Sequence, residues 1–227
     1  DAYNAAGQKC SAQSILFVHD NWADALLPRL ATLAARRSLG DLSIGPVLTW
    51  TNTRIQEHID AVLRVANAKL LFGGAPLQDH QSPDCYGAYT ATAIEVPLAA
   101  LCGDDFELLT TELFGPFQII ARYGDSDIPA VLGLLERMSH HLTAAVVSAD
   151  VEFQNRVLAA TVNGTTYCGM RARTTGAPQN HWFGPSGDPR AAGIGTPEAI
   201  ISTWSGHREI IFDQGELPGD WSVPPLV

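Results

Sequence analysis

The chain has 227 residues, of which 46% are hydrophobic and 17% are charged, a composition that excludes a disordered chain and allows a substantial core. The net charge of −10 disfavours a nucleic-acid partner, because phosphate binding needs clustered Lys and Arg. The four cysteines show no CxxC spacing, so we expect neither a metal site nor a disulfide framework. No apolar run approaches the ~18 residues that a membrane span needs.

Apolar residues along the chain alternate between strand-like runs and helix-like stripes. The runs predict strands at 15–18, 70–72, 92–96, 117–121, 142–147, 162–167 and 208–213. The stripes predict helices whose buried faces carry Trp22, Leu26, Leu30 and Leu33; Ile55, Ile59, Val62 and Leu63; Ile128, Val131, Leu132 and Leu135; and Phe153 with Val157. Predicted caps precede three of them, at Asp20, at Thr53 with Gln56, and at Asp150. This alternation predicts an α/β fold with a largely parallel sheet and helices on both faces.

The alternation breaks at residues 169–195, where six glycines and three prolines exclude a regular element. A loop of this length without its own secondary structure is most often functional. Thr196, Pro197 and Glu198 then predict the start of another helix. The proline-containing tail after Gly215 is predicted to be a flexible or docking arm.

Residues 7–12, Gly-Gln-Lys-Cys-Ser-Ala, place a thiol in a flexible turn just before the first predicted strand. A glycine lets the backbone come close to a ligand, and small residues after Cys10 leave room for a substrate carbon. The alternative is an ordinary small, apolar cysteine at a strand entrance. The stretch alone does not decide between the two.

No glycine-rich phosphate loop stands at a predicted strand-to-helix turn. Gly193, Ile194 and Gly195 precede a predicted helix, but no strand comes before them, so the pattern is not a dinucleotide fingerprint. Any nucleotide must therefore be held mainly by groups outside this chain.

Three segments in this order resemble the aldehyde dehydrogenase family. Residues 7–12 resemble its nucleophile loop, and residues 112–117, Glu-Leu-Phe-Gly-Pro-Phe, match the motif that the family places at the nicotinamide end of the cofactor. Residues 180–200 look like the Phe-Gly-Gly loop near the family's C-terminus, with Gly-Pro after Phe183. The stretches 70–74, 171–180 and 204–209 are similar to the plant-type Δ1-pyrroline-5-carboxylate dehydrogenases within that family. The likeness covers residues 1 to about 213.

The resemblance implies an aldehyde dehydrogenase catalytic domain over 1–205, with a C-terminal strand and an oligomerisation or docking tail over 206–227. Cys10, as thiolate, would attack the aldehyde of glutamate semialdehyde. The thiohemiacetal would pass a hydride to NAD, and water would then release glutamate. The backbone N–H of Cys10 would serve as one oxyanion donor.

The resemblance also assigns binding residues. Glu112 would hold the nicotinamide ribose, and Phe114 would pack near the nicotinamide ring. Ser11 and the loop Gly193, Ile194 and Gly195 would surround the amino-acid end of the substrate. The alternatives are that Glu112 is an ordinary helix-end acid, that Phe114 belongs to the core, and that the loop residues only form turns.

The resemblance further implies partners. Family members carry the nucleotide-binding domain, a side-chain oxyanion donor and the general base upstream of the nucleophile loop. We therefore expect this chain to lack a nucleotide-binding domain and to be inactive alone. An N-terminal nucleotide-binding half, from the same precursor or a separate chain, would complete it, in a homo-oligomer or larger assembly in the mitochondrial matrix. The alternative is a non-catalytic structural subunit, derived from a dehydrogenase half and recruited into a larger mitochondrial complex.

Overall fold

The computed structural model describes residues 2–40, 43–139 and 141–174, together with short stretches beyond residue 196 (197–198, 201, 205–206, 208–212, 215 and 219–220). The predicted substrate residues Gly193, Ile194 and Gly195 lie outside the described residues.

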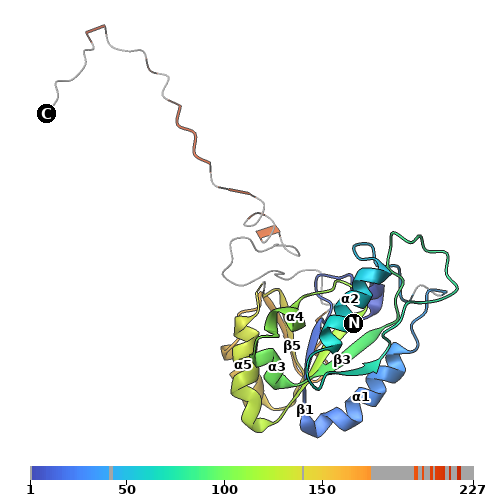
Figure 1. The fold of residues 1–227 in the computed structure, drawn as a ribbon. Helices are drawn as coiled ribbons and strands as arrows, with labels where there is room; N and C mark the ends of the chain where they lie inside the picture. The colour runs from blue at the N-terminus through green and yellow to red at the C-terminus, as the bar shows by residue number, and fades with distance from the viewer. Residues whose placement is uncertain are drawn as a thin grey trace.

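The main sheet has four strands in the order β1-β4-β3-β2 (Figure 1). They are β1 (Ile15–His19), β4 (Phe117–Tyr123), β3 (Thr92–Val96) and β2 (Lys69–Phe72). β1, β4 and β3 are parallel, whereas β2 runs antiparallel to β3. β4 has a neighbour on each side and is buried over its first five residues, as its mostly apolar run predicts.

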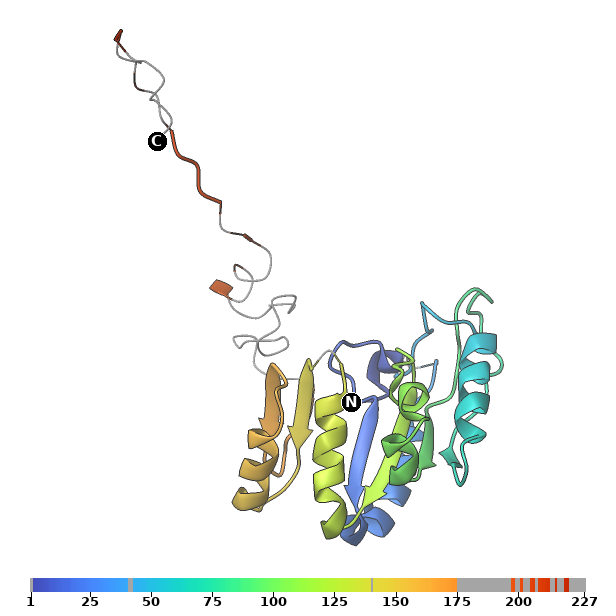
Figure 2. The ribbon, with the colours of Figure 1, turned by 60° about the vertical axis from the view of Figure 1, so that its left-hand side comes forward.

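A second, two-stranded sheet pairs β5 (Thr143–Val146) in parallel with β6 (Thr165–Cys168). The helix α6 (Val151–Ala159) connects the two strands and is capped by Asp150, whose carboxylate accepts the backbone N–H groups of Glu152 and Phe153, as predicted. Figure 2 shows this unit beside α5 (Ile128–Arg137). The largely parallel sheet is therefore confirmed, divided into two pieces within the described part of the chain.

Helices cover both faces of the main sheet. On one face, α1 (Asp20–Ala34) packs Ala23 and Leu27 against Val18, Ala93 and Ile120. The other face carries α2 (Asn52–Leu63), α3 (Leu98–Cys102), α4 (Phe106–Thr110) and α5 around a larger core. That core contains Ile55, Ile59, Val62, Leu101, Leu109, Leu134, Ile94 and Ile119. The predicted coverage of both faces is confirmed.

The predicted buried face of α1 is wrong at three of its four residues, since only Leu30 packs, partly buried, against the core. Trp22 is 67%, Leu26 41% and Leu33 56% exposed, while Ala23 and Leu27 are buried. Both sets recur at helical spacing, so periodicity alone could not choose between them. The small side chain of Ala23, which is fully buried, lets the helix axis approach the sheet closely, and this turns the bulkier residues outward.

Two further local predictions need correction. The N-cap of α2 is Thr51, whose hydroxyl accepts the Arg54 N–H, whereas the Gln56 side chain contacts Asp60 instead of the helix start. The apolar run at 70–72, which predicts a buried strand, does form β2, but Leu70 is 43% exposed because β2 lies at the edge of the sheet.

The strand predicted at 208–213 does not form in residues 208–212, the part of that range that the structure describes. Residues 208–212 carry no strand, and Ile210, Ile211 and Phe212 are exposed. No other part of the described chain pairs with this stretch, so its apolar residues are not used by the fold seen here. Pro197 and Glu198 are helical, as their pattern predicted.

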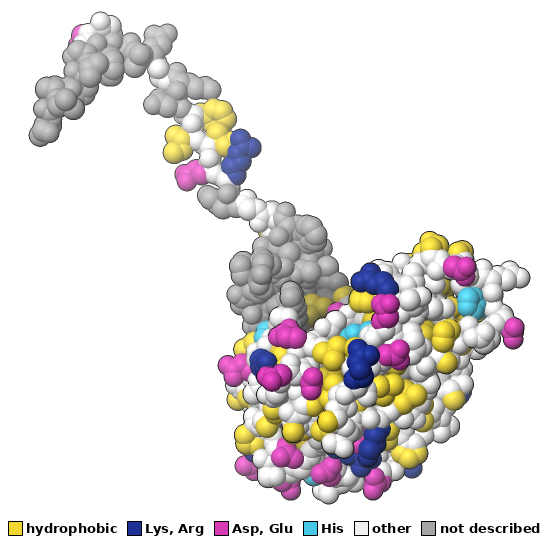
Figure 3. Space-filling view, viewed as in Figure 1, with side chains coloured by type: hydrophobic (Ala, Val, Ile, Leu, Met, Phe, Trp, Pro, Cys, Tyr) yellow, Lys and Arg dark blue, Asp and Glu magenta, His cyan; other side chains and the backbone are white. Residues whose placement is uncertain are grey.

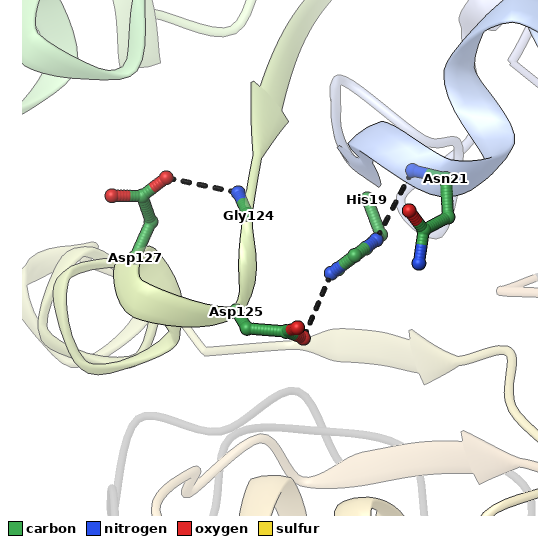
Figure 4. Close-up of polar contacts among 5 residues, drawn as sticks. All are labelled: His19, Asn21, Gly124, Asp125 and Asp127. Carbon is green, nitrogen blue, oxygen red and sulfur yellow. Dashed lines mark hydrogen bonds and ion pairs between the residues drawn. The ribbon is translucent and has the colours of Figure 1, made fainter.

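At the carboxyl ends of β1 and β4, polar contacts connect the two strands (Figure 4). His19, not Asp20, is the N-cap of α1: its Nδ1 accepts the Asn21 N–H at 3.2 Å. The proton therefore lies on Nε2, which donates to Asp125 at 3.1 Å. Beyond it, the Gly124 N–H donates to the carboxylate of Asp127 at 2.9 Å.

Candidate functional site

Two loops that lie far apart in the sequence meet at the amino end of the main sheet. The thiol loop (residues 7–12) directly precedes β1, and the Glu112 loop (residues 112–116) directly precedes β4. β1 and β4 are parallel neighbours, with Ile15 opposite Ile119. Segments that lead into adjacent parallel strands must approach the same edge, so the topology brings the two predicted motifs together.

The two loops touch through backbone atoms. Gly7 has φ of +71°, and a Cβ atom built on it would lie 2.1 Å from the carbonyl oxygen of Gly115. Glycine is therefore required at position 7 both by the backbone conformation and by the space available. The glycine of the thiol loop therefore serves a contact within the protein.

The thiol loop is a pair of tight turns. The Gln8 N–H donates to the Ala5 carbonyl at 3.1 Å, and the Ala12 N–H donates to the Lys9 carbonyl at 2.9 Å. Cys10 lies at the corner of the second turn and is exposed, whereas Ser11 is 9% exposed. The exposed corner gives the Cys10 thiol access to a small molecule.

The Glu112 loop follows α4 and holds its aromatic residue in an uncommon conformation. Glu112 is exposed, while Phe114 is half-buried with φ of +31°, in the left-handed region that non-glycine residues rarely adopt. Such a conformation costs on the order of 1–3 kcal/mol and is concentrated at functional sites. The loop is fixed to β3 by the Thr92 N–H, which donates to the Pro116 carbonyl at 2.8 Å.

A pocket lies where the two loops meet. Glu112 and Phe114 line it together with Gly7, Ala12 and Met138. The predicted cofactor residues thus share one pocket with the start and the end of the thiol loop. Cys10 and Ser11 belong to the same loop but are not among the lining residues.

A buried glutamine that sequence analysis missed holds both sides of the thiol loop. Gln118 in β4 is 1% exposed; its carbonyl accepts the Tyr3 hydroxyl at 3.3 Å, and its N–H donates to the Gln13 carbonyl at 3.4 Å. Tyr3 precedes the loop and Gln13 follows it. Burial raises the pKa of the Tyr3 hydroxyl, which keeps it protonated as a donor. The one sequence signal for this role was the position of Gln118 as a single amide in a predicted strand that is otherwise apolar.

Charged side chains are mixed in sign on the face seen in Figure 3, and the described residues hold no metal-ligand cluster. Figure 3 shows Asp and Glu side chains spread over the visible face, with Lys and Arg side chains between them. Within residues 2–40, 43–139, 141–174 and the described stretches beyond, no group of three His, Cys, Asp or Glu side chains could hold a metal ion. Among the same residues, no helix is both long and apolar enough to cross a membrane.

Comparisons with known proteins identify close relatives. The chain is 58% identical over 227 residues to a protein of Linum usitatissimum named "Probable aldehyde dehydrogenase". It is 56% identical over 228 residues to mitochondrial Delta-1-pyrroline-5-carboxylate dehydrogenase 12A1 of Arabidopsis thaliana. Each comparison covers 99% of this chain and 41% of the relative, so the chain spans about two fifths of the length of these relatives.

Solved structures show the same fold. Proline utilization A of Bradyrhizobium japonicum matches with a TM-score of 0.71 and 26% identity, over 89% of this chain and 20% of that one. An aldehyde dehydrogenase of Bacillus cereus, solved as an NAD+ complex, matches with a TM-score of 0.69 and 18% identity, over 88% of this chain and 38% of that one. The model of the aldehyde dehydrogenase family matches residues 1–195. The chain therefore belongs to the aldehyde dehydrogenase family.

Proposed function

We propose that this chain is the catalytic-domain part of an NAD-dependent dehydrogenase that oxidises glutamate semialdehyde, formed from Δ1-pyrroline-5-carboxylate, to glutamate in proline catabolism. The observation that carries the proposal is the contact between the thiol loop and the Glu112 loop through Gly7 and Gly115. Through this contact the exposed Cys10 thiol and the Glu112 loop lie at one edge of the sheet, and this supports the proposal that the Glu112 loop holds the nicotinamide end. The 56% identity to the Arabidopsis enzyme supports the substrate class.

The chemistry assigned to Cys10 has three steps. Its thiolate attacks the aldehyde carbon, which forms a C–S bond and an alkoxide that the Cys10 backbone N–H stabilises as a hydrogen-bond donor. The carbon then loses hydride, with its electron pair, and a thioester remains on Cys10. Water adds to the thioester, the C–S bond breaks, and glutamate leaves with a new carboxylate while the thiolate is regenerated.

The residues at the pocket fit the nicotinamide end of NAD, which when bound supplies the hydride acceptor. The exposed carboxylate of Glu112 can accept hydrogen bonds from ribose hydroxyls, and the half-buried ring of Phe114 can bound the nicotinamide. We also propose an N-terminal nucleotide-binding half as the partner that holds the rest of the dinucleotide and supplies the general base.

The remaining assignments belong to the same proposal. Ser11 and the loop 193–195 are the proposed contacts for the amino-acid end of the substrate. The proposed division is a catalytic domain at 1–205 and a tail at 206–227 that takes part in oligomerisation or docking. The proposed location is the mitochondrial matrix, which is supported by the word "mitochondrial" in the name of the Arabidopsis relative.

The test uses the full-length protein that contains this chain, with glutamate semialdehyde and NAD+, and follows NADH formation. Cys10→Ala should lower kcat at least about 10³-fold, because the nucleophile is lost. Cys102→Ala is the matched control, since Cys102 is also exposed but lies at the end of α3. Full activity of Cys10→Ala would contradict the proposal. A complex of native subunits without a nucleotide-binding half would instead indicate the structural subunit.

A further inference from the structure

The side chain of Gln8 connects the thiol loop to a remote segment of the chain. Its Nε2 donates to the Pro46 carbonyl at 2.8 Å, and its Oε1 accepts the Leu48 N–H at 2.8 Å. Nε2 also donates to the Ala5 carbonyl of its own turn at 3.2 Å. A carboxamide has two N–H donors and one carbonyl acceptor, which matches the two donated bonds and the one accepted bond. Among side chains, only Asn and Gln combine these groups.

The other bonds within the thiol loop act locally. The Gln8 N–H and the Ala12 N–H each close a turn by donating to a carbonyl three residues earlier. Such bonds define the shape of each turn, but they leave its position relative to the sheet free. The Gln8 amide, by contrast, spans 38 and 40 residues of sequence to reach Pro46 and Leu48. It therefore sets the place of the loop together with the Gly7 contact on Gly115 and the Gln118 amide.

The segment that receives these bonds is itself firmly held. Val47 is fully buried and pairs with Gly87 in an antiparallel bridge, with backbone hydrogen bonds of 2.6 and 2.9 Å. A Cβ built on Gly115 would lie 3.8 Å from a methyl group of Val47, so the Glu112 loop packs on the same segment. Residues 46–48 thus form a common support for both loops of the site.

We propose that Gln8 is a positioning residue, which holds the Cys10 thiol at the place where the aldehyde carbon and the nicotinamide end meet. This inference rests on the proposed function. Misplacing a reacting atom by about 1 Å can cost about 10²-fold in rate. The turn that carries Cys10 runs from Lys9 to Ala12 and begins directly after Gln8. A shift of Gln8 therefore moves this turn, and the Cys10 thiol with it.

The experiment compares Gln8→Leu and Gln8→Glu in the full-length protein. Leu has nearly the same size and makes none of the bonds; Glu retains the acceptor for the Leu48 N–H but loses both donors. Gln78→Leu is the matched control, because among the described residues the Gln78 amide bonds to Pro76 at 3.3 Å, within its own exposed loop. The readouts are kcat, the KM for NAD+, the melting temperature, and the rate of iodoacetamide alkylation at Cys10 and Cys102 by peptide mass spectrometry.

Both Gln8 variants should lower kcat about 10- to 100-fold with little change in the KM for NAD+. The alkylation rate of Cys10 should change at least about threefold, while that of Cys102 and all properties of Gln78→Leu stay the same. Unchanged kcat and Cys10 alkylation in Gln8→Leu would overturn the inference. So would a parallel rise of alkylation at Cys10 and Cys102 with a lower melting temperature, since that indicates general loosening. If the unmodified protein does not oxidise glutamate semialdehyde, the proposed function fails, whereas the alkylation rates still test the Gln8 contacts.

Discussion

At the amino end of β1 and β4, the backbone takes positive φ at Ala5, Ala6, Gly7 and Phe114, whereas at the carboxyl end His19 caps a regular helix. The amino end thus stores backbone strain, which surrounding contacts must offset. Its supports are the packing of Gly7 on Gly115 and two glutamine amides. The end of the sheet that carries the exposed Cys10 thiol is built from irregular backbone, held by the buried amide of Gln118 and the partly buried amide of Gln8.

The carboxyl end relies on exposed charges. His19 donates to Asp125, which is 90% exposed, and Arg122 pairs with Asp24, which is 92% exposed, at 3.0 Å. Exposed ion pairs of this kind contribute about 1 kcal/mol or less, because water and salt screen them. The comparison implies that substitutions at the amino end should cost more stability and change the reactivity of Cys10, while those at the carboxyl end should do neither.

Gly7→Ala should have the largest effect. An L-residue in the left-handed region costs about 1–2 kcal/mol, and the added methyl group collides with the Gly115 carbonyl, which adds about 1–3 kcal/mol. We expect a loss of about 2–5 kcal/mol in the free energy of unfolding, measured with urea. The loops must separate to make room, so kcat should fall at least about 10²-fold.

Gly133→Ala is the control for this substitution. Gly133 lies within α5, and a Cβ built on it would meet no atom within 4 Å. Alanine there should stabilise the helix by about 0.5–1 kcal/mol and leave kcat unchanged. If Gly7→Ala were as stable and active as the unmodified protein, the contact between the two loops would not hold the site.

Gln118→Leu should have the next largest effect. It removes a partner of the Tyr3 hydroxyl and of the Gln13 carbonyl, and a buried polar group without its partner costs about 1–3 kcal/mol. Tyr3→Phe combined with Gln118→Leu should cost less than the sum of the two single changes, because the pair is removed together. Urea unfolding of the four proteins measures this coupling.

Asp125→Asn, at the carboxyl end of the sheet, is the control and should change the free energy of unfolding by less than about 1 kcal/mol. Additive costs at Tyr3 and Gln118 would show that the two side chains do not support each other.

The sequence predicted the parts of the fold that depend on local pattern. The apolar runs at 92–96 and 117–121 became β3 and β4, and the Asp150 cap was found where expected. The buried face of α1 could not be predicted, because Trp22 and Leu26 recur at the same spacing as Ala23 and Leu27. Only the fit to the sheet decides which face turns inward.

The candidate site divides in the same way. Residue types predicted the turn that presents the Cys10 thiol, whereas the motif at Glu112 was identified only by its resemblance to the family, and the roles of both residues stay predictions. The roles of Gln8 and Gln118 were not readable, because their partners lie between 38 and 115 residues away in sequence. Contacts of that range depend on the order of strands, which no local pattern contains.

A pH dependence of stability is the smallest expected effect and comes from His58 at the amino end. Its ring packs edge-on against Phe117 at 5.3 Å, and its Nε2 is buried without a hydrogen-bond partner among the described residues. Burial lowers the pKa of His58 below its ordinary value of 6.5, since the charged form loses its hydration. His19, at the carboxyl end, has Asp125 as a partner instead.

The sign of this dependence follows from proton binding. Above pH 7.5 or so, His58 is neutral in both the folded and the unfolded chain, so it contributes no slope. As the pH falls through about 6.5, the unfolded chain binds the proton first, and stability decreases by at most about 1.4 kcal/mol per pH unit for this one group. His58→Leu should therefore flatten the stability curve, measured by urea unfolding, between about pH 7 and pH 5. An unchanged slope would mean that the ring gains hydration or a partner in solution, and that the amino end is less tightly packed around Phe117 than its contacts indicate.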